Sequence, residues 1–286
     1  MAKVIENKLT QPFLKWAGGK RQLLPEIRKY VPQKYNTYYE AFVGAGAVLF
    51  DLQPKKAVIN DINGELVNVY NVIKNNVEEL IEDLKTHKNE SEYFYSIRDL
   101  DRQSVYKDLS PVKKASRIIF LNKTCYNGLF RVNSHGQFNV PFGKYKNPEI
   151  VNENVLRAVH TYLNENDVII LNEDFSSAVS TAKKGDFVYF DPPYDPVSDT
   201  SSFTGYSLDG FNREDQLRLR DLCVSLDSKG VKFLLSNSAT DFIIEKYEEK
   251  GFIIERVSAT RNINSIATKR GKIDEVLVRN YDPNKN

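Results

Sequence analysis

Short apolar runs that alternate with segments of helical periodicity constrain the fold of this chain more than any other feature. Residues 38–43 have the character of a buried strand, and residues 47–52 have that of a helix. Gly44 and Gly46 lie between them and can form a tight turn. This strand, glycine turn and helix predict one unit of an α/β sheet.

The same alternation recurs along the chain, mostly in its second half. Further strands are predicted at residues 56–60, 168–171, 187–190, 232–236, 252–258 and 275–279, and further helices at residues 154–163, 176–182, 213–228 and 241–250. Strands that alternate with helices predict an α/β fold with a doubly wound, mostly parallel sheet. At 286 residues the chain has room for such a core and one insertion.

One long segment interrupts the alternation. Helical spacing of apolar residues covers 65–85 and much of 93–122, whereas residues 123–150 are rich in Asn, Gly, Phe and Pro and follow no clear period. We expect the last stretch to form ordered loops or a hairpin. The predicted domains are the first part of the catalytic core (1–64), an inserted helical and loop domain (65–152) and the second part of the core (153–286).

Charges are distributed unevenly along the chain, although the net charge is only +2. Residues 109–148 contain no Asp or Glu, where the overall acid frequency would place about five, and they hold seven Lys and Arg residues among aromatic ones. A second window without acids covers residues 256–273. Two cationic windows in a nearly neutral protein indicate a surface for nucleic acid, the alternative being unpaired charges on solvated faces.

The sequence argues against a membrane protein, a secreted protein and a metal-binding protein. Its longest uncharged, mostly apolar run, residues 41–50, is about half of a bilayer span. Cys125 and Cys223 cannot form a disulfide framework, and the first ten residues lack an apolar signal core. The three histidines lie far apart, without metal-ligand spacing. We therefore expect a cytoplasmic protein with no membrane partner and no metal.

The strongest chemical signal is the tetrapeptide from Asp191 to Tyr194, which directly follows the predicted strand at 187–190. Ligands of open α/β sheets bind at the carboxyl ends of strands, so a site is expected here. Pro192 and Pro193 keep the backbone extended and lack N–H donors, which leaves their carbonyls free to accept. A planar amine such as adenine N6 can donate to the Asp191 carboxylate and the Pro192 carbonyl, while Tyr194 offers a ring face to the base. The alternative is a strand exit bounded by prolines.

A second signal combines the glycine turn with an acidic residue. Asp61 follows the strand at 56–60, seventeen residues after Gly44, where nucleoside-binding sheets place the carboxylate that binds ribose hydroxyls. The third glycine of a dinucleotide fingerprint is absent, because position 49 is leucine. We therefore expect a nucleoside without phosphates to bind here. A structural turn with a helix-capping Asp is the alternative.

A glycine-rich segment near the N-terminus carries the only tryptophan, Trp16, and Lys20. It resembles a phosphate loop superficially, but Leu14 replaces a required glycine and Arg21 replaces the hydroxyl ligand for Mg²⁺. These differences exclude nucleotide hydrolysis. We expect the segment to close over a cofactor, the alternative being a turn with a packed Trp.

Six motifs in this order resemble those of the Dam-type (class alpha) DNA adenine-N6 methyltransferases. They are Lys-Trp-Ala-Gly-Gly-Lys at 15–20, Phe-Val-Gly-Ala-Gly at 42–46, Asn-Asp-Ile-Asn at 60–63, Tyr-Asn-Gly-Leu-Phe-Arg at 126–131, Phe-Asn-Val-Pro-Phe-Gly-Lys-Tyr at 138–145 and Asp-Pro-Pro-Tyr at 191–194. The resemblance covers about residues 11–281. It implies a class I methyltransferase-like fold, S-adenosylmethionine as methyl donor, double-stranded DNA as partner, base flipping, and usually GATC as target. The inserted domain would then recognise the target sequence.

The resemblance also implies roles for individual residues. Matching cofactor positions are Trp16, Lys20, Asp61 and Asp191, with Asp174 and Phe175 near the cofactor adenine, and Glu40, Phe42, Gly44 and Gly46 complete this candidate set. The catalytic motif is Asp191, Pro192, Pro193 and Tyr194. Tyr126 and Asn127 match residues that enter the duplex, Leu129, Arg131, Pro141 and Lys144 match the base-reading set, and Lys15 matches a further DNA contact. Arginine is common in the family where this chain has Lys144, and lysine lacks the fork that reads guanine.

Three other functions stay open at this point. A cytosine-N4 or an RNA N6-adenine methyltransferase shares the chemistry, and an Asp at the start of the catalytic motif only favours adenine. A catalytically inactive scaffold that binds DNA is a third function, which the intact motifs argue against. A cytosine-C5 methyltransferase is excluded, because neither cysteine follows a proline and the nucleophile is therefore missing. The chain also fits a role beside a separate cognate restriction endonuclease.

Overall fold

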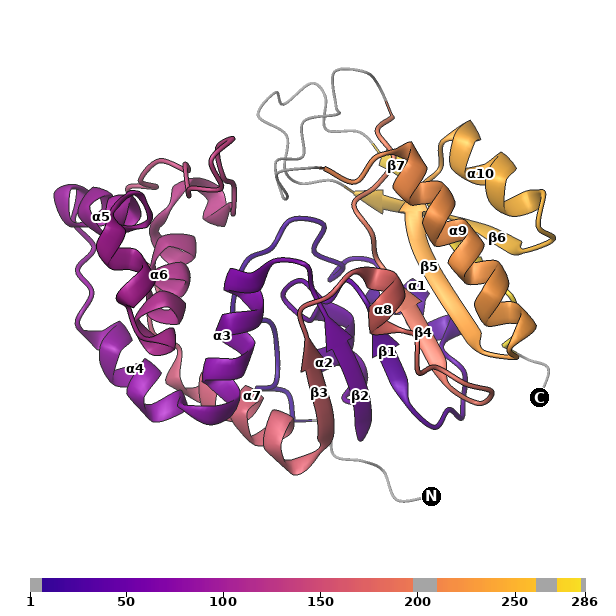
Figure 1. Ribbon diagram of the computed structural model, residues 1–286, viewed down its shortest axis with the longest axis horizontal. Helices are drawn as coiled ribbons and strands as arrows, with labels where there is room; N and C mark the ends of the chain where they lie inside the picture. The colour runs from indigo at the N-terminus through magenta and orange to yellow at the C-terminus, as the bar shows by residue number, and fades with distance from the viewer. Residues whose placement is uncertain (1–6, 198–209, 261–271, 284–286) are drawn as a thin grey trace.

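The computed structural model describes residues 7–197, 210–260 and 272–283, and a seven-stranded sheet forms its core (Figure 1). The strands are β1 (Tyr38–Glu40), β2 (Lys56–Asn60), β3 (Asp167–Leu171), β4 (Phe187–Phe190), β5 (Lys232–Ser238), β6 (Ile253–Thr260) and β7 (Lys272–Arg279). Their order is β3-β2-β1-β4-β5-β7-β6. Strand β7 is antiparallel to both neighbours, and the other pairs are parallel. The structure thus confirms the α/β fold with a mostly parallel sheet.

Helices cover both faces of this sheet. One face packs against α1 (Leu24–Tyr30), α2 (Ala47–Leu52) and α7 (Glu153–Glu165), and the other against α8 (Phe175–Ala178), α9 (Arg213–Ser228) and α10 (Asp241–Glu248). Side chains alternate along each strand, so Tyr38 and Phe187 join the first hydrophobic cluster while Tyr39 and Val188 join the second. Because both faces are covered, β4 consists of apolar and aromatic residues only.

The sheet brings the predicted chemical motifs to one edge. Glu40, at the end of β1, lies opposite Ile59 of β2 on one side and Tyr189 of β4 on the other. The ends of these three parallel strands are therefore neighbours. The strand order also reverses between β1 and β4, which is the position where open α/β sheets bind ligands.

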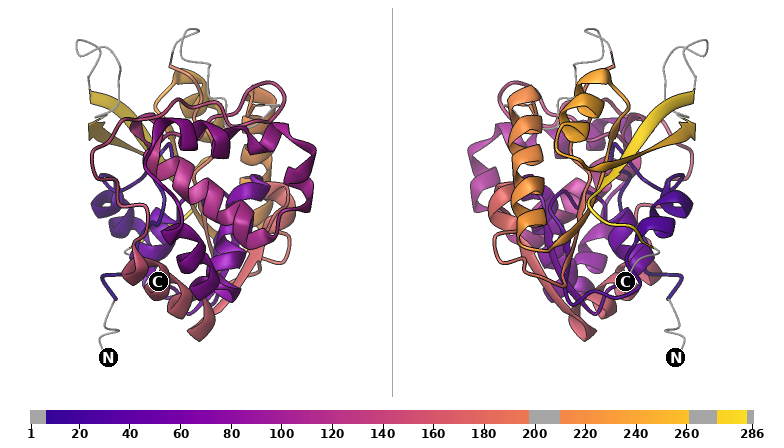
Figure 2. Two further views of the ribbon diagram at one scale, coloured as in Figure 1. Left: turned by 90° about the vertical axis from the view of Figure 1, so that its left-hand side faces the viewer. Right: turned by 90° about the vertical axis from the view of Figure 1, so that its right-hand side faces the viewer.

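Residues 64–124 form a helical layer beside the sheet (Figure 1, Figure 2). It contains α3 (Gly64–Asn75), α4 (Val77–Lys85), α5 (Ser91–Arg98) and α6 (Pro111–Thr124), with 3-10 helices at Asp99–Arg102 and Ser104–Asp108. Helix α3 packs against α6 and also against α7. Phe50 of α2, Tyr70 of α3 and Phe120 of α6 therefore belong to one hydrophobic cluster that continues from the sheet into the helical layer. The boundaries of the inserted domain stay a prediction.

The helices of this layer differ from the expected ones at two points. The helix expected at 65–85 is broken at Asn76, whose φ of −138° lies outside the helical region, and the chain restarts as α4. The helical stretch expected within 93–122 is divided into α5, two 3-10 helices and α6. The division before α6 occurs because the backbone at Leu109 is extended and the Ser110 side chain caps a new helix.

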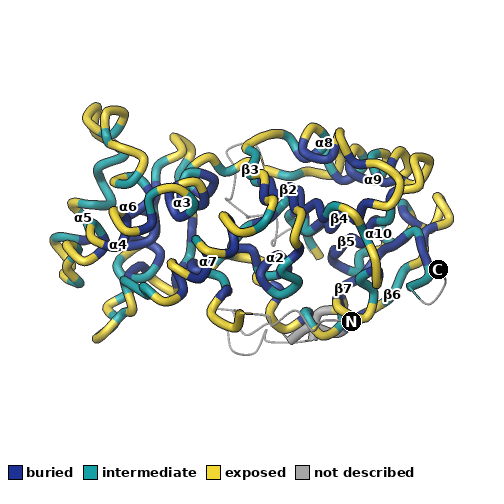
Figure 3. The backbone as a smooth tube through the Cα atoms, turned by 90° about the horizontal axis from the view of Figure 1, so that it is seen from below, coloured by how far each residue is buried: buried dark blue, intermediate teal, exposed yellow. Residues whose placement is uncertain are grey.

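Residues 123–150 form ordered loops around an irregular hairpin, as expected. Isolated antiparallel bridges join Cys125 to Phe142 and Val132 to Phe138, and a 3-10 turn lies at Tyr126–Gly128. Seen from below, many of the buried residues lie in the central strands and in helices α3 and α6 (Figure 3). Within the described ranges, no helix is long and apolar enough to cross a bilayer, and no cluster of potential metal ligands occurs.

Candidate active site

Asp191 lies directly after β4 and forms an ion pair with Lys20 from the N-terminal glycine-rich segment. Lys20 Nζ is 2.8 Å from Asp191 Oδ1, and the two side chains are 6% and 17% exposed. Lys20 Nζ also donates to the Gly18 carbonyl at 2.8 Å. The Lys20 ammonium is the only polar group that the described residues place beside the buried Asp191 Oδ1, which has no other donor. A carboxylate oxygen has more than one lone pair, so Asp191 Oδ1 can still accept from a donor on a ligand.

The environment of Asp191 also sets its protonation state. Burial raises the pKa of this carboxyl to about 6, the Lys20 ammonium opposes the rise, and the charge of Glu275 adds to it. Asp191 is therefore ionised at neutral pH and can accept a hydrogen bond from an amine. It loses that capacity as the pH falls below its pKa.

Glu40, at the end of β1, differs from Asp191 in its protonation state. The Tyr38 hydroxyl donates to Glu40 Oε2 at 2.7 Å, and the Glu40 residue is only 2% exposed. Burial raises the pKa of Glu40 to about 8, and the charge of Asp191 contributes to the rise. Glu40 is therefore mainly protonated at neutral pH and presents a neutral carboxyl group beside the candidate cofactor site.

Tyr194 is held at both its ring face and its hydroxyl group. Lys20 Nζ lies 4.5 Å from the ring centroid, and the Tyr194 hydroxyl donates to Glu275 Oε2 at 2.7 Å. Glu275 belongs to β7 and is 6% exposed. No motif in the sequence marks Glu275. Its place beside the catalytic motif follows only from the antiparallel pairing of β7 with β5.

The two prolines of the motif differ in whether their carbonyl groups accept a hydrogen bond. The Pro193 carbonyl accepts from Gln216 Nε2 at 2.9 Å, and Gln216 is held in turn by Asn237 Nδ2 at 3.0 Å. The Asp195 N–H donates to the same Asn237 side chain at 3.1 Å. The Pro192 carbonyl receives no hydrogen bond from the described part of the chain. The expectation of two free carbonyls was therefore wrong for Pro193, because buried Gln216 occupies it.

The glycine turn after β1 is tied to the end of β2. The Gly44 N–H donates to Asp61 Oδ2 at 3.0 Å, and Asp61 Oδ1 accepts from the Asn63 N–H at 2.9 Å. Gly44 and Gly46 have φ of +50° and +76°, which favour glycine. Trp16 packs so closely over the turn that a Cβ at Gly44 would lie 3.0 Å from its ring. Three residues predicted from separate motifs, Trp16, Gly44 and Asp61, are thus neighbours.

Aromatic side chains form the adjoining part of the candidate cofactor site. Phe42 stacks on Phe175 with ring centroids 5.5 Å apart, and Phe211 packs against both rings. Asp174 caps the short helix α8 and is paired with Arg218 at 3.1 Å. Burial opposes ionisation of Asp174, but hydrogen bonds from Ser176 and Arg218 hold its pKa below the ordinary value. The region therefore combines apolar ring surfaces with an ionised carboxylate.

The predicted DNA-binding residues gather on the hairpin of residues 123–150, with Lys15 beside it. Tyr126, Asn127, Arg131, Pro141 and Lys144 are exposed and Leu129 is partly exposed. The Tyr126 N–H donates to the Pro141 carbonyl at 2.8 Å, so the two arms carry these residues side by side. Arg131 donates through Nε to Asn139 Oδ1 at 2.7 Å, which orients its guanidinium group.

Lys15 and Trp16 connect this hairpin with the candidate cofactor site. The Lys15 N–H donates to Asn122 Oδ1 at 3.0 Å, and Asn122 Nδ2 donates back to the Lys15 carbonyl at 2.8 Å. Trp16, which covers the glycine turn, stacks on Phe130 with ring centroids 4.8 Å apart. The N-terminal segment therefore contacts the hairpin and the glycine turn at once.

The cationic window at 109–148 is only partly a free positive surface. Arg117 is buried and pairs with Asp101 at 2.7 Å, and Lys113 pairs with Asp83. Burial lowers the pKa of Lys123. Acids outside the window thus neutralise two of its cations, which reduces the unpaired charge inferred from the sequence. Most of the second cationic window lies outside the described residues.

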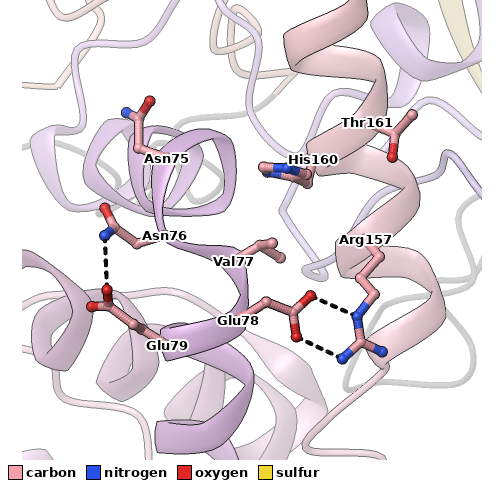
Figure 4. Close-up of a pocket in the computed structure, with 8 residues that line it drawn as sticks. All are labelled: Asn75, Asn76, Val77, Glu78, Glu79, Arg157, His160 and Thr161. Carbon is pink, nitrogen blue, oxygen red and sulfur yellow. Dashed lines mark hydrogen bonds and ion pairs between the residues drawn. The ribbon is translucent and has the colours of Figure 1, made fainter.

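Two surface hollows lie away from the carboxyl ends of the strands. One, of about 380 Å³, is lined by the end of α3, the start of α4 and one side of α7 (Figure 4). In it Arg157 donates two hydrogen bonds of 2.8 Å to Glu78, so both charges are paired. The other, of about 460 Å³, lies beside residues 35–36 and 52–56. Neither hollow contains a predicted site residue.

The family model and the sequence relatives agree on one family. The model of the family described as D12 class N6 adenine-specific DNA methyltransferase matches residues 16–263. The type II methyltransferase M1.LlaDCHI of Lactococcus lactis subsp. cremoris is 50% identical over 96% of this chain and 98% of the relative. The type II methyltransferase M.MjaIII of Methanocaldococcus jannaschii is 45% identical over 95% and 99% of the two chains. The DNA adenine methylase of Escherichia coli K12 is 32% identical over 94% and 95%.

Proposed function

Because the chain belongs to the D12 class N6 adenine-specific DNA methyltransferases, we propose that it transfers a methyl group from S-adenosylmethionine to adenine N6 in duplex DNA, within GATC. The observation that carries this proposal is the buried Asp191 Oδ1, an acceptor whose only polar partner among the described residues is the Lys20 ammonium. It lies at the carboxyl end of β4, in the same motif as the Tyr194 ring and the Pro192 carbonyl, which receives no hydrogen bond from the described residues. An exocyclic amine on a planar base complements this arrangement.

The residues around the glycine turn fit S-adenosylmethionine. Asp61 provides a half-buried carboxylate at the end of β2, the paired rings of Phe42 and Phe175 provide apolar surface, and Asp174 lies beside them. We assign the cofactor site to Trp16, Lys20, Glu40, Phe42, Gly44, Gly46, Asp61, Asp174, Phe175 and Asp191. S-Adenosylmethionine supplies an electrophilic methyl group on a sulfonium, so the transfer needs alignment of the reacting atoms more than a strong base.

The residues of the catalytic motif would orient the amine. Asp191 Oδ1 accepts one N6–H and the Pro192 carbonyl accepts the other, which draws electron density onto nitrogen. Asp191 then takes the proton that the methylated nitrogen releases. In the free protein Lys20 balances the charge of Asp191 at 2.8 Å. The Pro193 carbonyl takes no part, because Gln216 occupies it.

The target base has to leave the duplex before it can reach Asp191. Adenine N6 is paired inside the helix, so the nucleotide rotates out, and unstacking costs a few kcal/mol. We propose that Tyr194 stacks on the extruded adenine and that Tyr126 and Asn127 occupy the space it leaves. Leu129, Arg131, Pro141 and Lys144 would read the surrounding bases, and Lys15 would add a contact. The exposure of most of these residues on one hairpin supports this assignment.

The test is to incubate the protein with labelled S-adenosylmethionine and GATC duplexes, digest the DNA and identify the methylated nucleoside. We expect N6-methyladenine. Asp191→Ala should abolish turnover while duplex binding stays largely intact, because the change removes the acceptor and leaves the hairpin untouched. Asp221→Ala, which alters an exposed carboxylate on α9, is the matched control and should keep full activity. Near-normal methylation by Asp191→Ala would refute the assigned role.

The same digestion separates the remaining alternatives. N4-methylcytosine in the digest, or methylation of RNA in preference to DNA, would replace the proposed substrate. Duplex binding without any methylated product would indicate an inactive scaffold. Two of the relatives are named type II methyltransferases, and we therefore propose that this chain protects DNA against a separate restriction endonuclease.

A further inference from the structure

The hydrogen bond from Tyr194 to Glu275 joins the catalytic motif to the antiparallel strand β7. Glu275 pairs with Ser238 of β5 and with Val257 of β6 in the sheet. Because β7 runs opposite to β5, its first residues lie at the edge where β4 and β5 end. The side chain of Glu275 thus reaches Tyr194 although the two residues are 81 positions apart.

A carboxylate at such a buried position needs a specific partner. Glu275 is 6% exposed, and the Tyr194 hydroxyl is 2.7 Å from its Oε2. Burial raises the pKa of the Tyr194 hydroxyl well above its ordinary value, so the tyrosine keeps its proton and stays the donor. Hydrogen bonds to an ionised acceptor are the stronger ones. The contact therefore fixes the far end of the tyrosine ring.

Two anchors fix the axis of this ring, and because a phenolic O–H lies in the plane of its ring, the position of the acceptor also favours one plane. At its near end Tyr194 follows Pro193, whose carbonyl is held by Gln216. At its far end the hydroxyl group is held by Glu275. A ring fixed at both ends presents a face of constant orientation. In the free protein Lys20 Nζ lies over this ring, 4.5 Å from its centroid.

We propose that Glu275 is a positioning residue for methyl transfer, which holds the Tyr194 ring in the plane that receives the extruded adenine. The proposal rests on the proposed function, in which that ring stacks on the target base. Glu275 does not touch the substrate in this scheme. Its loss should therefore misalign the bound adenine, lowering kcat, and leave the KM for S-adenosylmethionine unchanged.

A double-mutant cycle tests the coupling. Tyr194→Phe removes the donor and Glu275→Met removes the acceptor, and each should lower kcat about tenfold, as expected for one charged hydrogen bond. The double variant should be no slower than the slower single variant, because both changes remove the same contact. If the loss of kcat in the double variant equals the product of the two single losses, the two side chains act independently and the proposal is overturned. Should Glu275→Met fail to fold, Glu275→Ser, whose side chain is too short to reach Tyr194, completes the same cycle.

Two further variants separate positioning from stability. Glu275→Gln keeps an oxygen acceptor and should restore kcat to within about threefold of the wild type, since the tyrosine still has a partner. Tyr189→Phe removes another buried tyrosine contact, the 2.8 Å bond to Ser236, and should reduce thermal stability without lowering kcat. Equal loss of kcat in Glu275→Gln and Glu275→Met would also overturn the proposal. If the wild-type protein forms no N6-methyladenine, the proposed function fails; if it does and the cycle is additive, only the role of Glu275 fails.

Discussion

At the scale of single residues, the burial of Asp191 controls the pH range in which the site can work. Burial raises its pKa to about 6 in the free protein, so kcat/KM should fall about tenfold per pH unit below that value, as the carboxylate becomes protonated and stops accepting from the amine. A pH–rate profile between pH 5 and about 8 measures this. A profile that stays flat down to pH 5 would contradict the assignment.

A change at Lys20 tests whether the acid limb of the pH–rate profile belongs to Asp191. Its ammonium lies 2.8 Å from Asp191 Oδ1 and opposes the effect of burial on the Asp191 pKa. Lys20→Met should therefore raise this pKa further and move the acid limb of the profile to higher pH. If Lys20→Met only weakened cofactor binding, the KM for S-adenosylmethionine would change and the acid limb of the profile would stay at the same pH.

The position of the motif from Asp191 to Tyr194 could be predicted from the sequence, but the residues that support it could not. Asp191 and Tyr194 are adjacent to a strand whose pattern is visible locally, so their place at a strand end was predictable. Gln216, Asn237 and Glu275 come from α9, β5 and β7, and none belongs to a recognisable motif. Their roles depend on which strands pair, and that pairing is not encoded in any local spacing.

At the scale of elements, the turn between β1 and α2 depends on glycine at position 46. A Cβ there would lie 2.7 Å from both the Phe50 ring and the Tyr70 hydroxyl, and φ is +76°. Gly46→Ala should destabilise the protein by about 2–5 kcal/mol, the sum of a left-handed alanine and an overpacked core. Thermal or denaturant unfolding measures the loss.

Gly251 is the matched control for this change. Its φ of +75° is nearly the same, but no atom lies within 4 Å of the added Cβ. Gly251→Ala should therefore cost only the conformational part, about 1–2 kcal/mol. Equal losses in the two variants would show that packing around the turn adds nothing.

Strands and helices with a clear period were predicted closely, and irregular junctions were not. The helices at 47–52 and 213–228 and the strands at 56–60 and 187–190 have the predicted bounds. The break at Asn76 was missed, because apolar spacing continues through it and only the backbone angles show it. Apolar periodicity reports which face is buried, and it does not report where the chain turns between two helices on the same face.

At the scale of the whole molecule, charge on the DNA side depends on pairs that the linear sequence does not show. Lys146 is exposed and has no ion pair within the described ranges, whereas Lys113 is paired with Asp83. Lys146→Ala should weaken binding to all duplexes alike and reduce the slope of log K against log salt by about one unit. Lys113→Ala should change this slope much less. Titrations at several salt concentrations measure both, and equal changes would contradict the pairing argument.

The proposed function assigns the chemistry and the reading of the target to different parts of the molecule, so the two should be separable by mutation. Asp191 and Tyr194 lie at the sheet edge, whereas Arg131 lies on the hairpin, held by Asn139 at 2.7 Å. A guanidinium fork oriented in this way suits guanine O6 and N7. Loss of one such contact should relax discrimination at one guanine of the target about ten- to a hundredfold.

The measurement is the methylation rate on GATC duplexes compared with duplexes in which one base pair is changed. Arg131→Ala should slow GATC more than the duplex altered at the guanine that Arg131 reads, so the ratio of the two rates falls. Arg131→Lys keeps the charge but not the fork, and it should lose discrimination nearly as far while it retains more of the salt-dependent affinity. A phosphate contact behaves differently, because phosphates are the same at every sequence. If Arg131→Ala slows all duplexes by one common factor, Arg131 binds the backbone and reads no base.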